Sequence, residues 1–236
     1  MKKFSLVIPT YNERENVVTI LRRLQTLLDG AMPGEYELIV VDDDSPDRTW
    51  EAAEALTAEI PAVRVIRRVD DRGLATAVVA GWKTAQGEFL GVIDADLQHP
   101  PEVVLKFVEA LENGADLVVG SRHVEGGGTK DWSLIRRILS RGARALGCLI
   151  LPAAGAVSDP MSGFFALRRD AVDFAELRPL GYKILLEVLG RGRFSKIEEV
   201  GYVFQARTEG ASKVTWRLYW EYLVQIWRLR TAPRKK

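Results

Sequence analysis

The chain has 236 residues, 47% of them hydrophobic and 28% charged, with a net charge of +1 at pH 7. This length and composition suit one globular domain with a full core, or one domain with a small addition, and the near-neutral charge provides no global basic field that would favour nucleic acid as a partner. The single cysteine, Cys148, excludes a disulfide within the chain and indicates a reducing compartment. No apolar run approaches the roughly 20 residues that a membrane-spanning helix needs.

Strand-length apolar runs alternate with amphipathic stretches through the first 120 residues. The predicted strands are 4–8, 37–41, 63–67, 89–93 and 117–119, and the predicted helices are 13–28, 50–58, 74–85 and 100–111. This alternation is typical of a mostly parallel sheet with helices on both faces. We therefore expect an α/β fold in which the first half is doubly wound.

The second half shows a different pattern after a flexible break at 126–128. A basic amphipathic helix, or a pair of helices, is predicted over 132–151, followed by a strand at 163–167, a helix at 182–189, a strand at 197–204 and a helix at 216–229. The segments 132–151 and 216–229 combine aromatic residues with cations, as helices at a membrane surface do. Packing of their apolar faces on the core is the alternative.

Polar residues gather where the predicted strands end, and ligands of open α/β sheets bind beyond those ends. Asp94 and Asp96 follow one strand, and carboxylates at this spacing can hold Mg²⁺ or Mn²⁺ against a nucleotide-sugar diphosphate. The alternative is that Asp96 only caps the helix that begins near Pro100. Such an acidic rim also argues against a nucleic-acid groove.

A second acidic run, 42–47, follows the second strand. Asp42 is the better ligand candidate, for a nucleobase or ribose, because it lies nearest the strand end. Asp43 and Asp44 are expected to be turn residues, and Asp47 a helix N-cap. The chain contains neither G-x-G-x-x-G after its first strand nor G-x-x-x-x-G-K-[ST]. These motifs are the main sequence evidence for a dinucleotide-dependent oxidoreductase and for a P-loop enzyme, so neither class is favoured.

Six motifs in this order resemble those of family 2 inverting glycosyltransferases with the GT-A fold. They are 6–13 (LVIPTYNE), 42–47 (DDDSPD), 94–102 (DADLQHPPE), 120–122 (GSR), 140–143 (SRGA) and 159–165 (DPMSGFF). Together they are similar to the polyprenol-phosphate (dolichol-phosphate) mannosyltransferases, over residues 4 to 213. Arg48 departs from the pattern, because many relatives have glycine after Ser-Pro-Asp.

The resemblance implies a role for each matching residue. Guanosine of GDP-mannose would contact Pro9, Tyr11, Glu13, Val40 and Asp42. Asp94 and Asp96 would meet the sugar diphosphate, Asp96 and Gln98 would bind Mg²⁺ or Mn²⁺, and Arg122 and Arg136 would bind phosphate oxygens. Arg207 and Lys213 would close on the diphosphate, so that Asp94, Asp96, Arg122 and Arg136 form the catalytic set.

The implied reaction is metal-dependent transfer of mannose to a polyprenyl (dolichyl) phosphate with inversion, at the cytoplasmic face of a membrane. We expect residues 1–214 to form the GT-A domain, with a nucleotide-sugar half to about 122 and an acceptor half from about 123 to 214, and 215–236 to form an amphipathic helix and basic tail. A membrane-embedded anchor protein is a possible partner. UDP-glucose as donor, or a saccharide acceptor with Asp159 as its general base, remain alternatives.

Overall fold

The computed structural model describes residues 2–129, 142, 147–205 and 216–231. Its central sheet has seven strands in the order β3-β2-β1-β4-β7-β5-β8, and a two-stranded sheet pairs β6 with β9. The strands are β1 (Phe4–Thr10), β2 (Tyr36–Asp42), β3 (Val63–Arg67), β4 (Phe89–Val92), β5 (Leu117–Ser121), β6 (Gly128–Thr129), β7 (Phe165–Arg168), β8 (Ile197–Gly201) and β9 (Val203–Phe204). The α-helices are α1 (Arg14–Ala31), α2 (Thr49–Glu54), α3 (Leu74–Thr84), α4 (Val103–Glu112), α6 (Ile184–Arg191) and α7 (Trp216–Thr231), with 3-10 helices at Pro152–Ala156 and Arg169–Ala171.

The large sheet is mostly parallel, as predicted, with one antiparallel strand. β7 runs antiparallel between β4 and β5, whereas the other pairs in the sheet are parallel. All residues of β1 and β2 are buried, which is the pattern of strands covered on both faces. The mixed, mostly parallel sheet of the predicted fold class is confirmed.

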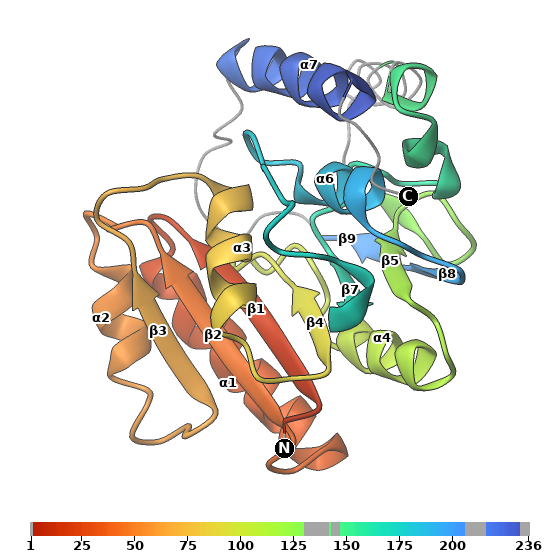
Figure 1. Ribbon diagram of the computed structural model, residues 1–236. Coiled ribbons are helices and arrows are strands. Elements are labelled where there is room, and N and C mark those ends of the chain that lie inside the picture. The colour runs from red at the N-terminus through yellow and green to blue at the C-terminus, as the bar shows by residue number, and fades with distance from the viewer. Residues whose placement is uncertain (1, 130–141, 143–146, 206–215, 232–236) are drawn as a thin grey trace.

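Helices cover both faces of the sheet (Figure 1), and a separate hydrophobic core lies under each face. Because side chains alternate along a strand, Leu6 and Ile8 of β1 pack in the core under α1, α2 and α4, whereas Val7 packs in the core under α3 and α6. Figure 1 shows α3 and α6 on the near face of the sheet and α1 behind it. The carboxyl ends of β1, β2 and β4 therefore meet at one edge, between helix layers.

The predicted strand over 197–204 is in fact two strands that belong to different sheets. β8 pairs with β5 as far as Gly201, and β9 pairs with β6 from Val203. At the break, a Cβ on Gly201 would lie 2.0 Å from the carbonyl oxygen of Glu125. The chain can pass this close to the loop only if the residue is glycine. The pattern of apolar residues contains no information on such a close approach, so it did not predict the break.

The final helix has one packed side and one exposed side chain of note. Tyr222, Ile226 and Leu229 of α7 join a third cluster with Leu151 and Leu186, which confirms core packing for this side. Trp227, in contrast, keeps 65% of its surface exposed. Within the described ranges, no helix combines the length and apolar character needed to cross a bilayer. The predicted helix over 132–151 lies mostly outside the described residues, although 147–150 are helical.

Arg48 has a left-handed backbone, with φ of +61°, immediately before α2. This conformation costs a non-glycine residue about 1–2 kcal/mol, which explains why glycine suits the position. We expect Arg48→Gly to raise the free energy of unfolding by about 0.5–1 kcal/mol, after allowing for the entropy that glycine loses on folding. Urea unfolding would measure the change. Arg48→Ala is the matched control; an equal gain there would trace the effect to the side chain and contradict this account.

Candidate active site

Residues with a strained backbone conformation lie at the edge of the sheet where the predicted ligands also lie. Among the described residues, the non-glycine residues with positive φ are Asn12, Asp44, Arg48 and Leu97, at 55° to 61°. All four follow the carboxyl ends of β1, β2 or β4. Such conformations persist where the surrounding structure holds them in place, and they concentrate at functional sites.

Asp94, Asp96 and His99 converge after β4. One ligand atom from each lies within 4.8 Å of the others, so the three can hold a metal ion. His99 Nδ1 is 3.6 Å from Asp94 Oδ2, and Asp96 is only 7% exposed. Two carboxylate oxygens and an imidazole nitrogen fit Mn²⁺, and the carboxylates alone fit Mg²⁺. The prediction of a divalent-cation site at Asp94 and Asp96 thus has a suitable set of donors.

His99 belongs to the 94–102 motif but has no predicted role, and the structure places it in the cluster with the two aspartates. Its ring is 3% exposed and packs against Phe164, Tyr202 and Phe204, at centroid distances of 4.9, 5.5 and 5.5 Å. Burial lowers the pKa of His99 to about 4, so the imidazole is neutral at pH 7. A neutral imidazole is the form that coordinates metals.

The alternative role for Asp96, as a helix cap, is not what the structure shows. α4 begins at Val103, its N-cap is Glu102, and no side chain caps it. Asp96 Oδ1 instead accepts a hydrogen bond of 3.2 Å from Gln98 N. Gln98, the other predicted metal ligand, donates its side-chain amide to Gln205 O at 3.1 Å, which ties this loop to the residue after β9.

Arg122, the predicted phosphate ligand after β5, forms a buried bidentate ion pair with Asp159. Its Nε and Nη2 donate to the two carboxylate oxygens at 2.6 and 2.8 Å, and its guanidinium lies 5.6 Å from the ring centre of Phe204. Burial opposes the charge of both groups, but the pairing holds the pKa of Asp159 below its ordinary value and that of Arg122 above it. Asp159 therefore fixes the direction of the arginine.

Asp42 is fully buried and helps to build the turn after β2. Its carboxylate accepts hydrogen bonds from Thr10 Oγ1, Ser45 N and Ser45 Oγ at 2.8, 2.8 and 2.6 Å. The N-cap of α2 is Arg48 and not Asp47 as predicted. Asp47 lies one residue earlier, and its carboxylate accepts hydrogen bonds from the amides of Arg14 and Thr49, the first residues of α1 and α2. These contacts give the turn a structural role besides the predicted ligand role of Asp42.

Asp43, expected to be a turn residue, binds two residues of the loop after β3, Arg68 and Gly73, and we call these contacts the clamp. It forms an ion pair with Arg68, and its Oδ2 accepts from Gly73 N at 2.7 Å. In the same loop, Arg72 lies 5.4 Å from the ring centre of Tyr11. The clamp therefore holds this loop beside the predicted nucleotide ligand Tyr11.

The other predicted nucleotide ligands lie on or beside the same two strands. Pro9 is buried in β1, and Val40 is buried in β2 with its side chain in the core. Glu13 lies before α1, where its amide donates to Thr49 Oγ1 and its carboxylate accepts from Asn16. Arg136, Arg207 and Lys213 lie outside the described residues, so their predicted roles stay predictions.

Comparison with known proteins places the chain in a family. Residues 5–174 match the model of glycosyl transferase family 2. The chain is 48% identical to the dolichol-phosphate mannosyltransferase of Pyrococcus furiosus and 38% identical to that of Saccharomyces cerevisiae, over 96% and 95% of its length. It spans 63% of the archaeal relative and 85% of the yeast relative.

Solved structures show the same fold. Glucosyl-3-phosphoglycerate synthase from Mycobacterium tuberculosis, in a complex with Mn²⁺, UDP-glucose and phosphoglyceric acid, superimposes with a TM-score of 0.73 at 22% identity, over 99% of this chain and 81% of that one. An identity this low supports only a shared fold. Membership of the family is instead supported by the family match and by the curated relatives, which are similar in sequence. The chain therefore belongs to glycosyl transferase family 2, within the group of the dolichol-phosphate mannosyltransferases.

Proposed function

We propose that the protein transfers mannose from GDP-mannose to the phosphate of a polyprenyl (dolichyl) phosphate, with inversion and release of GDP. The names of its relatives support the reaction class. The observation that carries the choice of acceptor is the pairing of Asp159 with Arg122. A carboxylate with a lowered pKa in a bidentate ion pair is a poor general base, so Asp159 would deprotonate a neutral sugar hydroxyl inefficiently.

An acceptor phosphate needs no base, because it is already anionic at neutral pH. Its oxygen would attack the anomeric carbon as the bond to the diphosphate breaks, and GDP would leave with the bonding electrons. Asp94 and Asp96, with His99 or Gln98, would hold the divalent cation, which neutralises charge on the leaving diphosphate. Arg122, directed by Asp159, would bind a phosphate oxygen.

The lipid acceptor and the surface near α7 support a peripheral site on a membrane. Trp227 and Leu149 are 65% and 78% exposed, and Arg228 and Arg230 are exposed cations on the same helix as Trp227. Exposed aromatic and aliphatic side chains beside arginines suit the headgroup layer of an anionic membrane. We propose that this surface faces the cytoplasmic leaflet, or a membrane-embedded anchor protein that lies in it.

Label transfer in detergent tests the proposal. Radiolabelled GDP-mannose and polyprenyl phosphate should give organic-extractable label with Mg²⁺ or Mn²⁺, and EDTA should remove that label because the diphosphate would lose its counter-charge. If label were transferred from UDP-glucose but not from GDP-mannose, the choice of mannose would be wrong, whereas the proposed transfer to a lipid phosphate would stand. If neither donor reacted with the lipid but a saccharide accepted sugar, the lipid-phosphate proposal would fail.

A further inference from the structure

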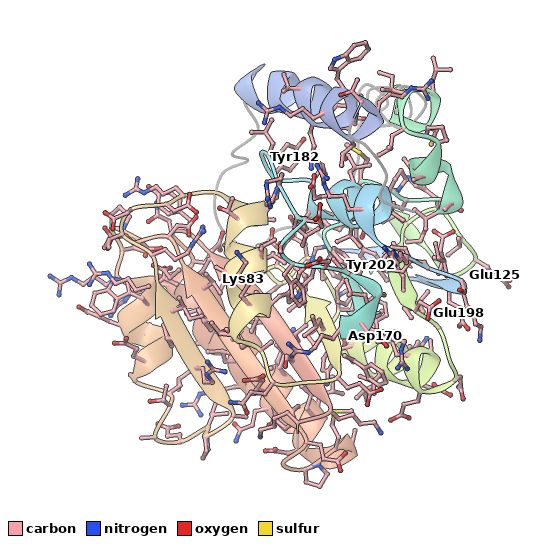
Figure 2. The ribbon with its side chains drawn as sticks, viewed as in Figure 1. Lys83, Glu125, Asp170, Tyr182, Glu198 and Tyr202 are labelled. Atoms are coloured by element: carbon pink, nitrogen blue, oxygen red, sulfur yellow. The ribbon has the colours of Figure 1, made fainter. Side chains whose placement is uncertain are left out.

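Lys183 lies immediately before α6 and reaches toward the loop that carries Asp159. Its Nζ donates to Met161 O at 2.8 Å and lies 4.5 Å from the ring centre of Tyr182. The side chain is half-buried. Figure 2 shows Tyr182 below α7, in the region between α3 and α6. A lysine that buries its stem and keeps a directed ammonium group at a polar loop is suited to hold an anion.

The charge of Lys183 lacks a counter-ion in the part of the chain that the structure describes. No carboxylate there lies within 4.0 Å of its Nζ, and the nearby Asp159 is already engaged by Arg122 through two hydrogen bonds. Burial and the positive charge of Arg122 lower the pKa of Lys183 to about 8, whereas Asp159 and Asp94 act in the opposite direction. The site thus holds two neighbouring cations, Arg122 and Lys183, and one carboxylate committed to the first of them.

The backbone around Lys183 is held from both sides. Gln225 of α7, itself 2% exposed, donates its side-chain amide to Lys183 O at 3.1 Å. On the other side, Ala75 N of α3 donates to Gly181 O at 3.4 Å. These contacts fix the position from which the side chain extends, so little ordering is left for a ligand to impose.

We infer that Lys183 Nζ binds a non-bridging oxygen of the acceptor phosphate, as a second cation beside Arg122. The inference rests on the proposed function and adds a substrate-binding residue to it. The acceptor is favoured over the donor because Nζ is held at Met161 O, in the loop whose Asp159 directs Arg122, while the donor diphosphate is expected at Asp96. A phosphate on a lipid that approaches along α7 would reach Lys183 and Arg122 together.

Steady-state kinetics of Lys183→Met would test the assignment. We expect the KM for polyprenyl phosphate to rise about 10- to 100-fold, as for loss of one charge-assisted hydrogen bond, with the KM for GDP-mannose unchanged. Lys183→Arg should recover part of the loss, since it restores the charge. Lys83→Met is the matched control, because Lys83 is an exposed lysine on α3, away from this loop (Figure 2). Thermal unfolding would establish that each variant is folded.

Direct binding separates this inference from the proposed function. A short-chain prenyl phosphate would be titrated into wild-type protein and Lys183→Met by calorimetry, without a sugar donor. Weaker binding by the variant supports the inference even if the wild type transfers no mannose, in which case only the proposed reaction fails. Equal binding by both proteins, or a change confined to the KM for GDP-mannose, would overturn it.

Discussion

Asp96→Asn is expected to lower the rate of mannosyl transfer by about 1,000-fold, the equivalent of roughly 4 kcal/mol of transition-state stabilisation. The substitution preserves the size of a side chain that is 7% exposed but removes its charge from the cluster with Asp94 and His99. The divalent cation would be held less well, and negative charge on the departing diphosphate would be less compensated. Single-turnover transfer of labelled mannose would measure the loss.

Two comparisons make this result specific. Glu109→Gln, an exposed carboxylate on α4, should leave the rate unchanged. Raising the Mn²⁺ concentration should recover part of the activity of Asp96→Asn if weak metal binding is the cause. Wild-type activity in Asp96→Asn at micromolar metal would show that Asp96 is not a ligand.

Breaking the buried pair of Arg122 and Asp159 is expected to have the second largest effect. Asp159→Asn would leave the arginine, whose side chain is 10% exposed, without its counter-charge, at a cost of about 3–5 kcal/mol in the free energy of unfolding. The lowered pKa of Asp159 gives the same contribution a pH dependence. It is present above the ordinary aspartate pKa of about 4 and is lost as pH falls through the lower folded value. Urea unfolding at neutral and acidic pH would measure both effects.

A double variant separates stability from activity at this pair. Arg122→Met with Asp159→Leu replaces the ion pair by apolar side chains, which often restores the stability that either single change removes. Transfer should nevertheless stay low in the double variant, because no guanidinium is left to meet the phosphate. Recovery of both stability and transfer would show that the pair is only structural.

The sequence by itself determined the order and type of most elements. Alternating apolar runs and amphipathic stretches indicated the strands and helices of the first half, because burial on both faces of a parallel sheet requires continuous apolar strands. The residues at the strand ends, above all Asp94 and Asp96, could be chosen for the same reason: parallel strands end at one edge, and ligands bind there. The six ordered motifs then indicated the family.

Tertiary structure alone decided which side chains meet across long distances in the chain. His99 reaches Asp94 and Asp96 because a left-handed turn at Leu97 and a cage of distant aromatic rings place it there. From the sequence, Asp159 is a candidate general base; in the folded chain it is the partner of Arg122, because the antiparallel path into β7 brings the two side chains together. Lys183 carries no local signal, since its surroundings come from the 159–161 loop, α3 and α7. Periodicity and motifs report local preference and burial, whereas ion pairing and desolvation depend on contacts that only the folded chain creates.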